Sequence, residues 1–263
     1  TQSRSSAASD VYKRQLHGGG GQAEKIAKMT GMNDAADKYG FVAVYPQGLD
    51  RAWNDGRDIN KLKRKADDVG FLSELCKTLI ADYAIDPLRI YCIGVSNGAM
   101  MSFRLAAESP TLVAAACGVV GGVTENLVQD YPLRSPVPVM MIVGDEDPLV
   151  PFGGGDITLL GFGKRGRILP QEEGARWWAE KNGASLDAEV INLPDTVPED
   201  GCTVTQITYP SPLGDDVVLL IVRGGGHTWP QGEQYLPEKL VGRVCWDIGN
   251  DLIWEFLSAH PNR

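Results

Sequence analysis

The sequence is poor in the residues that metal sites and nucleic-acid interfaces require. Its 263 residues include only three histidines and five cysteines, and no two cysteines form a C-x-x-C pair. We therefore expect no zinc site built from cysteine and histidine, and no other bound metal. Acidic residues outnumber basic ones by 34 to 25, giving a net charge of -9 that repels phosphate backbones. Nucleic acid is thus not an expected partner.

Long apolar runs are also missing from the chain. The run at residues 113–123, "VAAACGVVGGV", is too short and too rich in glycine to cross a bilayer, so we expect no membrane span. Two cysteines, Cys92 and Cys117, lie in apolar runs and are expected to be small buried side chains. Another two, Cys202 and Cys245, flank the last expected strand and could form a disulfide, although the sequence cannot pair them.

Apolar strands and helices alternate along the chain. Most of the expected strands are apolar nearly throughout, which is typical of a parallel sheet covered on both faces. The pattern predicts one α/β domain with a mostly parallel, doubly wound sheet. Strands are expected at 41–46, 89–94, 137–144 and 217–224, and helices at 67–83, 99–108, 170–183 and 246–260. Two long loops, 152–167 and 193–202, are of the length that often carries function.

The sharpest motif is Gly94-Val95-Ser96-Asn97-Gly98, a G-x-S-x-G pattern. It follows an expected strand and precedes an expected helix, which is the context this motif requires. Such a turn forces the serine into a strained backbone conformation and exposes its hydroxyl at the carboxyl edge of the sheet. Ser96 is therefore our candidate nucleophile.

A serine nucleophile needs a general base that is held by an acid. His227, in "RGGGHTWP", follows an expected strand near the end of the chain and is the candidate base. His17 is better explained as support for the glycine loop that follows it, and His260 as a surface residue. The acid should follow a strand between Ser96 and His227, where Asp145, Glu146 and Asp147 occur together. The pattern alone does not choose among these three carboxylates.

The oxyanion of an acyl-transfer intermediate needs two preorganised donors. We expect one to be the backbone N–H of Asn97 and the other to come from the glycine run after His17, at Gly19 or Gly20. A phosphate-binding loop is disfavoured, since the run contains neither G-x-G-x-x-G nor a P-loop lysine. Trp53 and Trp229 are candidate walls of a substrate site, and packing in the core explains each of them equally well.

Several segments together resemble the polyhydroxybutyrate depolymerase / feruloyl esterase type of carbohydrate esterase, within the α/β-hydrolases. The matching stretches, in the order that the family has them, are "LHGGGG", "GFVAVYPQGLDRAWNDGR", "ADDVGF", "GVSNGAMMSFRLA", "DPLVP" and "GGGHTWP". The resemblance implies an α/β-hydrolase with Ser96 as nucleophile, His227 as base and Asp147 as acid, and no cofactor. The segment "VGDED" departs from the family's usual form, which leaves Asp145 as a rival acid.

The resemblance also implies a substrate class and a location. Expected substrates are short-chain acyl esters, feruloyl or acetyl esters of plant polysaccharide, or a polymeric ester of the polyhydroxyalkanoate type. Export from the cell is usual in the family, so an extracellular or periplasmic location is expected. A peptidase of the same fold and a non-catalytic hydrolase-fold binding protein are the alternatives, and the oligomeric state stays open.

The residues that precede the glycine loop do not fit the family. The segment "SSAASDVYKRQ", Ser5–Gln15, resembles a translated sequencing-library adapter. We hypothesise that residues 1–15 are not natural protein and that residues 16–263 form an N-terminally truncated esterase domain. A central strand is normally apolar on both faces, so burying Lys13 or Arg14 there would leave a charge with no evident partner. We therefore expect the glycine loop to lack the strand that should hold it.

Overall fold

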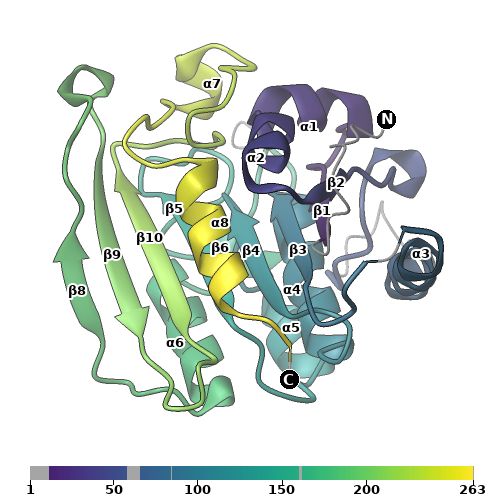
Figure 1. The fold of residues 1–263 in the computed structure, drawn as a ribbon. Coiled ribbons are helices and arrows are strands. Elements are labelled where there is room, and N and C mark those ends of the chain that lie inside the picture. Colours follow the sequence, from purple (N-terminus) through teal and green to yellow (C-terminus); the bar gives the residue numbers. More distant parts are fainter. Residues whose placement is uncertain (1–11, 58–65, 84, 160–161, 263) are drawn as a thin grey trace.

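The computed structural model describes residues 12–57, 66–83, 85–159 and 162–262, and its core is an eight-stranded sheet (Figure 1). The strand order is β2-β1-β3-β4-β5-β10-β9-β8. All neighbours from β2 to β10 are parallel, whereas β9 and β8 add an antiparallel edge. The strands are β1 (Tyr12–Leu16), β2 (Val42–Val44), β3 (Ile90–Val95), β4 (Ala115–Val119), β5 (Val139–Gly144), β8 (Glu189–Asn192), β9 (Thr203–Tyr209) and β10 (Val217–Arg223).

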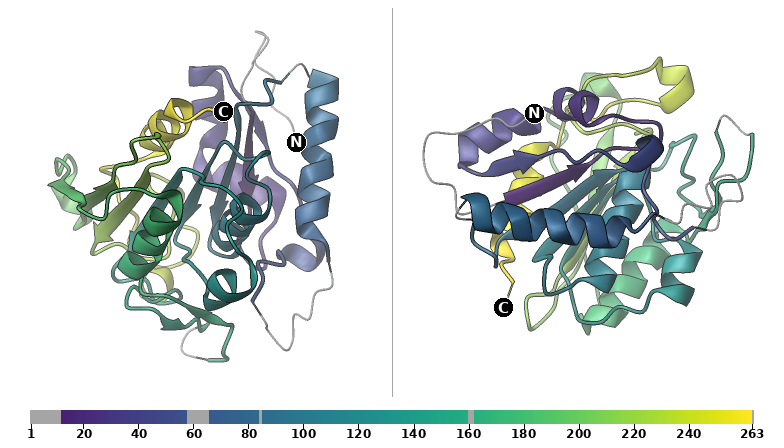
Figure 2. Two further views of the ribbon diagram at one scale, coloured as in Figure 1. Left: turned by 90° about the horizontal axis from the view of Figure 1, so that it is seen from below. Right: turned by 90° about the vertical axis from the view of Figure 1, so that its right-hand side faces the viewer.

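Helices cover both faces of this sheet (Figures 1 and 2). One face carries α1 (Ala23–Thr30), α2 (Met32–Tyr39) and α8 (Asn250–Ala259); the other carries α3 (Asp68–Tyr83), α4 (Asn97–Glu108), α5 (Glu125–Asp130) and α6 (Gln171–Asn182). Short elements complete the chain: η1 (Leu49–Arg51), β6 (Gly155–Asp156), β7 (Arg167–Ile168), η2 (Pro198–Asp200) and α7 (Glu238–Val241). No helix within the described ranges has the length and apolar character needed to cross a membrane. The expected doubly wound, mostly parallel sheet is confirmed.

The parallel strands contribute side chains to two separate hydrophobic cores, one on each face of the sheet, because successive side chains point to opposite faces. On β3, Ile93 packs with the core beneath α1, α2 and α8, while Cys92 packs with the core beneath α3 to α6. The second core is closed by Trp178 and Phe103, both fully buried with ring centroids 6.1 Å apart. Burying an aromatic side chain of this kind contributes about 1.5–3 kcal/mol to the free energy of unfolding. Burial on both faces explains why these strands are apolar throughout.

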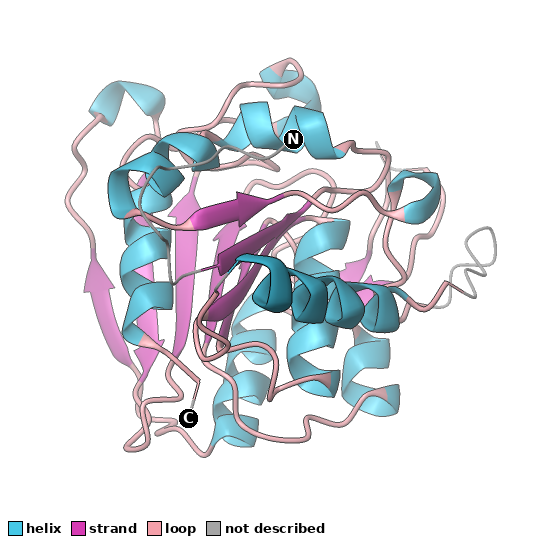
Figure 3. Cartoon of the chain, turned by 45° about the vertical axis from the view of Figure 1, so that its right-hand side comes forward, coloured by secondary structure: helices cyan, strands magenta, loops and turns pink. Residues whose placement is uncertain are grey.

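The antiparallel edge of the sheet was not predicted from the sequence. All four residues of β8 are exposed, and β9 reads "TVTQITY", in which polar residues alternate with apolar ones. Half-exposed strands of this kind lack the continuous apolar run that identifies β3, β5 and β10. β8, β9 and β10 lie side by side at the left of Figure 1, and Figure 3 shows the sheet in magenta with helices in cyan around it.

The expectation that the glycine loop lacks its supporting strand was wrong. Residues Tyr12–Leu16 form β1, which pairs with β2 on one side and β3 on the other, with Arg14 opposite Cys92. Arg14 is fully buried and has a partner, since its Nη1 donates to the backbone carbonyl of Leu72 at 3.0 Å. Residues 12–15, which were expected to lie outside the esterase domain, thus belong to the central sheet. Residues 1–11 of the proposed adapter segment and the side chain of Lys13 lie outside the described residues.

Gln15 of β1 buries a polar side chain whose hydrogen bonds are only partly satisfied. Its side chain is 1% exposed, and Oε1 accepts a hydrogen bond from Thr30 Oγ1 at 2.9 Å, whereas Nε2 has no partner among the described residues. A buried amide donor without an acceptor costs about 1–2 kcal/mol. Gln15→Met keeps the volume and removes that donor, and Thr30 retains Ile26 O as an acceptor.

We expect Gln15→Met to raise the melting temperature by about 2–8 °C, measured by calorimetry. The matched control is Gln234→Met, because the Gln234 side chain is exposed and donates to two carbonyls. A melting temperature for Gln15→Met that equals or falls below that of the unsubstituted chain would contradict this account of β1.

Candidate active site

Ser96 lies at the tight turn between β3 and α4. Its backbone has φ 56° and ψ −117°, a conformation that residues other than glycine rarely adopt. The flanking positions have no room for a side chain: a Cβ on Gly94 would lie 2.1 Å from Gly98 O, and a Cβ on Gly98 would lie 2.2 Å from Leu16 O. Close packing against β1 and α4 therefore explains both glycines of the motif, and leaves the Ser96 side chain at the carboxyl edge of the sheet.

The residue after the serine is clamped by the segment "RAWNDGR". Asn97 Oδ1 accepts from the backbone N–H of Trp53 at 2.8 Å, and its Nδ2 donates to Trp53 O at 3.0 Å and to Asp55 Oδ2 at 2.6 Å. Asp55 in turn forms a buried ion pair with Arg57. As the first residue of α4, Asn97 has a backbone N–H with no acceptor within the helix. The clamp fixes the direction in which this N–H points.

Asn97→Ala is expected to lower both stability and turnover. It removes the acceptor of the Trp53 N–H and one of the donors to the buried Asp55 carboxylate, which costs about 2–4 kcal/mol. The freed turn also misplaces the Asn97 N–H, so kcat should fall about 10- to 100-fold with a smaller change in KM. Ester kinetics and urea unfolding measure the two effects.

Asn126→Ala, on the exposed surface of α5, is the control. If Asn97→Ala had the same stability and turnover as Asn126→Ala, the proposed role of the Asn97 side chain in holding the turn would be refuted.

His227 and Asp147 form the hydrogen-bonded pair that a serine nucleophile needs. His227 Nδ1 lies 2.7 Å from Asp147 Oδ2, and the two side chains are 6% and 2% exposed. The other carboxylate oxygen of Asp147 accepts from the backbone N–H groups of Leu149 and Val150 at 2.8 and 2.9 Å. The carboxylate is thereby held in place and acts as the acceptor of the Nδ1 proton. Nε2 is then the nitrogen of His227 left for the serine.

Asp145, the rival acid, has a different task in the structure. Its Oδ1 accepts from Gly224 N at 2.7 Å, and its Oδ2 pairs with Arg223 at 3.3 Å. These bonds tie the end of β5 to the end of β10. Glu146 is exposed, and its backbone N–H donates a hydrogen bond to Gly225 O. Of the three carboxylates that the sequence left open, the structure brings Asp147 to His227.

The loop that carries His227 is fixed through its backbone. His227 N donates to Val241 O at 2.5 Å, and the Tyr235 hydroxyl donates to His227 O at 3.0 Å. Burial, together with the nearby Asp147 charge, raises the pKa of the Tyr235 phenol, so that the hydroxyl stays protonated and remains a donor. The sequence analysis missed Tyr235, since a tyrosine in a polar loop gives no signal of this role.

The glycine loop approaches the serine turn through Gly18 and Gly19, whereas the expected donor was Gly19 or Gly20. A Cβ on Gly18 would contact Ser96 Cβ at 3.5 Å, and one on Gly19 would contact Asn97 Cβ at 3.8 Å. The N–H of Gly20 donates instead to Arg51 O at 2.6 Å, which removes Gly20 as an oxyanion donor. Gly19 stays a candidate donor, and its position next to Ser96 makes Gly18 a second candidate. His17 supports the loop as expected: it is buried, and its Nε2 accepts from Gly48 N at 3.0 Å.

The two tryptophans proposed as substrate walls are buried structural residues. Trp53 is 2% exposed, and its indole N–H donates to His17 O at 2.9 Å. Trp229 is fully buried, and its indole N–H donates to Asn250 Oδ1 at 3.0 Å. Neither borders the cavity at Ser96. The wall prediction was therefore wrong for both, and packing in the core explains them.

Part of the chain matches a known protein family. Residues 10–148 match the model of the family described as "Esterase PHB depolymerase", which is more than half of the chain. The chain belongs to the esterase PHB depolymerase family.

Individual relatives of this family member are esterases by name. The "Putative esterase NocK" of Nocardia uniformis subsp. tsuyamanensis is 34% identical over 224 residues, which is 82% of this chain and 64% of the relative. Feruloyl esterase B of Neurospora crassa is 33% identical over 110 residues, covering 40% of this chain and 37% of the relative. The chain thus spans less than two thirds of the length of each of these two relatives.

The solved structure of an acetyl xylan esterase from Aspergillus awamori has the same fold. It superposes with a TM-score of 0.63 over 96% of this chain and 90% of the other, at 15% sequence identity. The fold of this family member is therefore that of the α/β-hydrolases, as the sequence resemblance implied.

A cavity of about 600 Å³ opens above Ser96, between α1, the glycine loop and the His227 loop. Its volume is that of a site for a small ligand or one end of a polymer. The long loop at 152–167 contributes one wall, so the expectation that this loop matters at the site agrees with its position. Ser96, Asn97, His227, Gly18 and Gly19 border the cavity. Its apolar lining is Ile26, Met29, Val95, Leu149, Val150, Ile157, Leu159 and Leu236.

Proposed function

We propose that this protein is a serine esterase that hydrolyses carboxylic esters through an acyl-enzyme on Ser96. The observation that carries the proposal is the buried His227–Asp147 pair, whose histidine borders the same cavity as the strained, outward-facing Ser96. A nucleophile, a base and an acid held in one constellation are what acyl transfer to serine requires.

In the first half of the reaction, Ser96 Oγ attacks the ester carbonyl while His227 Nε2 takes its proton. Asp147 holds the imidazole with its Nδ1 proton facing the carboxylate and stabilises the cation that forms. The backbone N–H of Asn97 and that of Gly18 or Gly19 donate to the oxyanion. The intermediate collapses when the C–O bond breaks, and His227 returns the proton to the leaving alcohol.

In the second half, water hydrolyses the acyl-enzyme. His227 takes a proton from the water, the hydroxide adds to the acyl carbonyl, and the same donors stabilise the oxyanion. Collapse releases the carboxylic acid and returns the proton to Ser96. The residues present supply every proton transfer, so the cycle needs nothing beyond ester and water.

The apolar cavity favours an acyl group or aromatic ring of modest size. We propose short-chain acyl esters, feruloyl or acetyl esters of plant polysaccharide, or polyhydroxyalkanoate-type esters as substrates, in keeping with the names of the relatives. An extracellular or periplasmic location is proposed from the family resemblance, because export is usual in that family. The intact Ser96–His227–Asp147 set supports catalysis over a binding role, and among the described residues no separate peptide-docking domain favours a peptidase.

The proposal is tested with a panel of acetyl, butyryl and feruloyl esters and polyhydroxybutyrate, assayed with the purified protein. We expect hydrolysis of at least one class with saturation kinetics, and no release of peptides from casein. Turnover of no ester at any concentration, with the chain folded by circular dichroism, would contradict the proposed activity.

Charged residues at the edge of the cavity add an expectation about substrate charge. Three cations, Lys25, Lys28 and Arg165, border the cavity together with one carboxylate, Glu233. Within the described part of the chain, none of the three cations forms an ion pair. In a protein of net charge -9, a local excess of positive charge raises the concentration of an anionic substrate at this opening.

We expect a preference for esters that carry a carboxylate, measured with 4-acetoxybenzoate against its neutral methyl ester. The triple variant Lys25→Gln, Lys28→Gln, Arg165→Gln should lower kcat/KM for release of acetate from the anion about three- to tenfold, and change that of the methyl ester less than twofold. Added salt should have the same selective effect. Equal losses on both esters would contradict the electrostatic explanation.

A further inference from the structure

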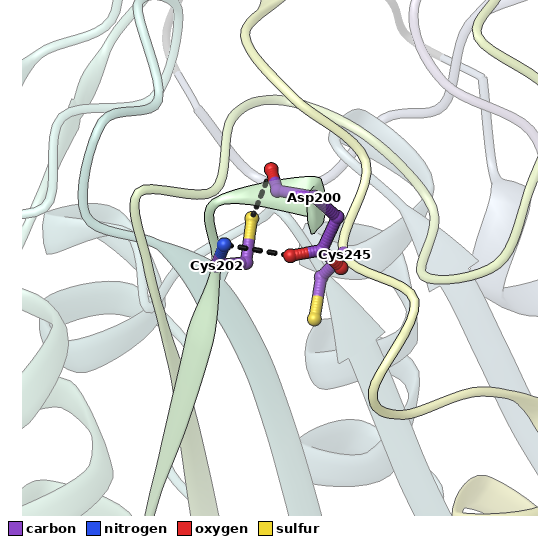
Figure 4. A group of neighbouring side chains, drawn as sticks. All are labelled: Asp200, Cys202 and Cys245. Carbon is purple, nitrogen blue, oxygen red and sulfur yellow. Dashed lines mark hydrogen bonds between the residues drawn. The ribbon is translucent and has the colours of Figure 1, made fainter. Parts of the chain in front are cut away.

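Two cysteines far apart in the sequence meet beside the loop that carries His227. Cys202 lies just before β9, and Cys245 lies in the segment that leads to α8; both side chains are 2% exposed. Their sulfur atoms and a carboxylate oxygen of Asp200 all lie within 4.8 Å of one another (Figure 4). All five cysteines of the chain are in the described ranges and are free thiols, so this structure represents the reduced protein.

Hydrogen bonds already tie together the two segments that carry these thiols. Asp200 accepts from Cys202 N through Oδ1 and from Trp246 N through Oδ2, each at 2.6 Å. Two residues after Cys245, Asp247 Oδ1 accepts a hydrogen bond from Thr196 N at 2.6 Å. The backbones on both sides of the sulfurs are thus held in a fixed relation. A change of χ1 to another staggered rotamer moves a cysteine sulfur by about 3 Å, enough to bring two sulfurs from this separation to bonding distance.

A metal ion is a poorer occupant of this cluster. A structural zinc site has four ligands, and the described residues supply three candidate atoms. Both oxygens of Asp200 are already engaged by backbone N–H groups, which orient the carboxylate toward the chain. The geometry therefore favours a bond between the sulfurs over ligation by them.

We propose that Cys202 and Cys245 form a disulfide when the protein is in an oxidising environment. With oxidised glutathione as the oxidant, one thiolate attacks a glutathione sulfur and releases a glutathione thiolate. The second thiolate then attacks the mixed disulfide and releases the other glutathione. Two S–H bonds and one S–S bond are exchanged for a protein S–S bond and two glutathione thiols, so atoms and electrons balance.

The bond would brace the segment on which His227 rests. Gly226 N and Thr228 Oγ1 both donate to Arg243 O, at 3.1 and 2.7 Å, and Gln231 N donates to Cys245 O at 2.9 Å. Anchoring Cys245 to the start of β9 therefore limits the opening of the His227 loop. Because a cross-link over this length of chain restricts the unfolded state, we expect a higher melting temperature and a longer half-life of activity at elevated temperature.

The folded, reduced protein should oxidise slowly. Burial, followed by the nearby Asp200 charge, raises the pKa of the Cys202 thiol to about 12, and burial raises that of Cys245. Because the thiolate is the attacking species, closure should occur during folding or under mild denaturant. Once formed, the buried bond should resist reduction of the native protein.

The experiment compares protein kept in dithiothreitol with protein equilibrated in oxidised glutathione at a urea concentration just below unfolding. Each cysteine falls in its own tryptic peptide, so alkylation followed by a non-reducing digest assigns every thiol. We expect the peptides of residues 182–223 and 244–263 to be joined and the other three cysteines to be alkylated. The melting temperature should rise by about 5–10 °C on oxidation.

Variants make the outcome decisive. In Cys202→Ser and in Cys245→Ser the rise on oxidation should vanish, whereas Cys76→Ser, which loses a buried thiol elsewhere, should keep it. Five alkylated cysteines after oxidation, or a link between any other pair, would overturn the proposal. So would a zinc ion that is retained after dialysis, protects both thiols from alkylation and is lost from Cys202→Ser.

Discussion

Replacing Ser96 by alanine is expected to lower kcat/KM for 4-nitrophenyl acetate by at least about 10⁴-fold. Without the hydroxyl, no acyl-enzyme can form, and only the oxyanion donors and the cavity remain to assist attack by water. The fold should be unaffected, because alanine removes one atom that borders the cavity and leaves the backbone turn unchanged. Hydrolysis is followed by release of 4-nitrophenol, with the stability of each variant measured by urea unfolding.

Ser102→Ala is the matched control for this change. Ser102 lies on the same helix, is fully buried and donates to Gly98 O at 2.9 Å, so its loss tests general damage to α4. We expect it to retain activity within about threefold. If Ser96→Ala hydrolysed the ester at the rate of Ser102→Ala, Ser96 would not be the nucleophile.

The second large effect is expected at the acid. Asp147→Asn should lower kcat about 10⁴-fold, because an amide in that place no longer favours the Nδ1-protonated histidine that presents a basic Nε2 to the serine. KM should change little, since Asp147 lies behind His227 and does not border the cavity. Steady-state kinetics on 4-nitrophenyl acetate separate the two constants.

Asp145→Asn distinguishes a catalytic acid from a structural carboxylate two residues away. Its partners are Arg223 and Gly224, so the variant should lose stability and keep kcat within about tenfold. The reverse result, with Asp145→Asn inactive and Asp147→Asn active, would show that Asp145 rather than Asp147 is the acid.

Local sequence predicted the parts of the site that depend on local structure. The turn at Ser96 could be predicted because strand, glycine-flanked serine and helix are contiguous, and steric limits at Gly94 and Gly98 act over short range. The parallel sheet followed from strands that are apolar on both faces. His227 could be proposed because it follows a strand end, yet the choice among three consecutive acidic residues depended on the family resemblance.

The predictions that failed concern properties that arise from packing between distant segments. Whether Trp53 borders a cavity or fills the core depends on where "RAWNDGR" lies against α4, which no local pattern encodes. The bond from Gly20 to Arg51 likewise joins two loops. β1 was missed because Arg14 and Gln15 are polar, although their side chains reach partners on α3 and α1.

Labelling with a fluorophosphonate shows whether Ser96 is activated, because this probe reacts only with an activated serine. We expect one label per chain, located on Ser96 by peptide mass spectrometry. The label should be strongly reduced in His227→Ala and Asp147→Asn, whose folds are verified by urea unfolding. An unlabelled protein, or a label on any other residue, would contradict the assignment of Ser96, His227 and Asp147 as a catalytic triad.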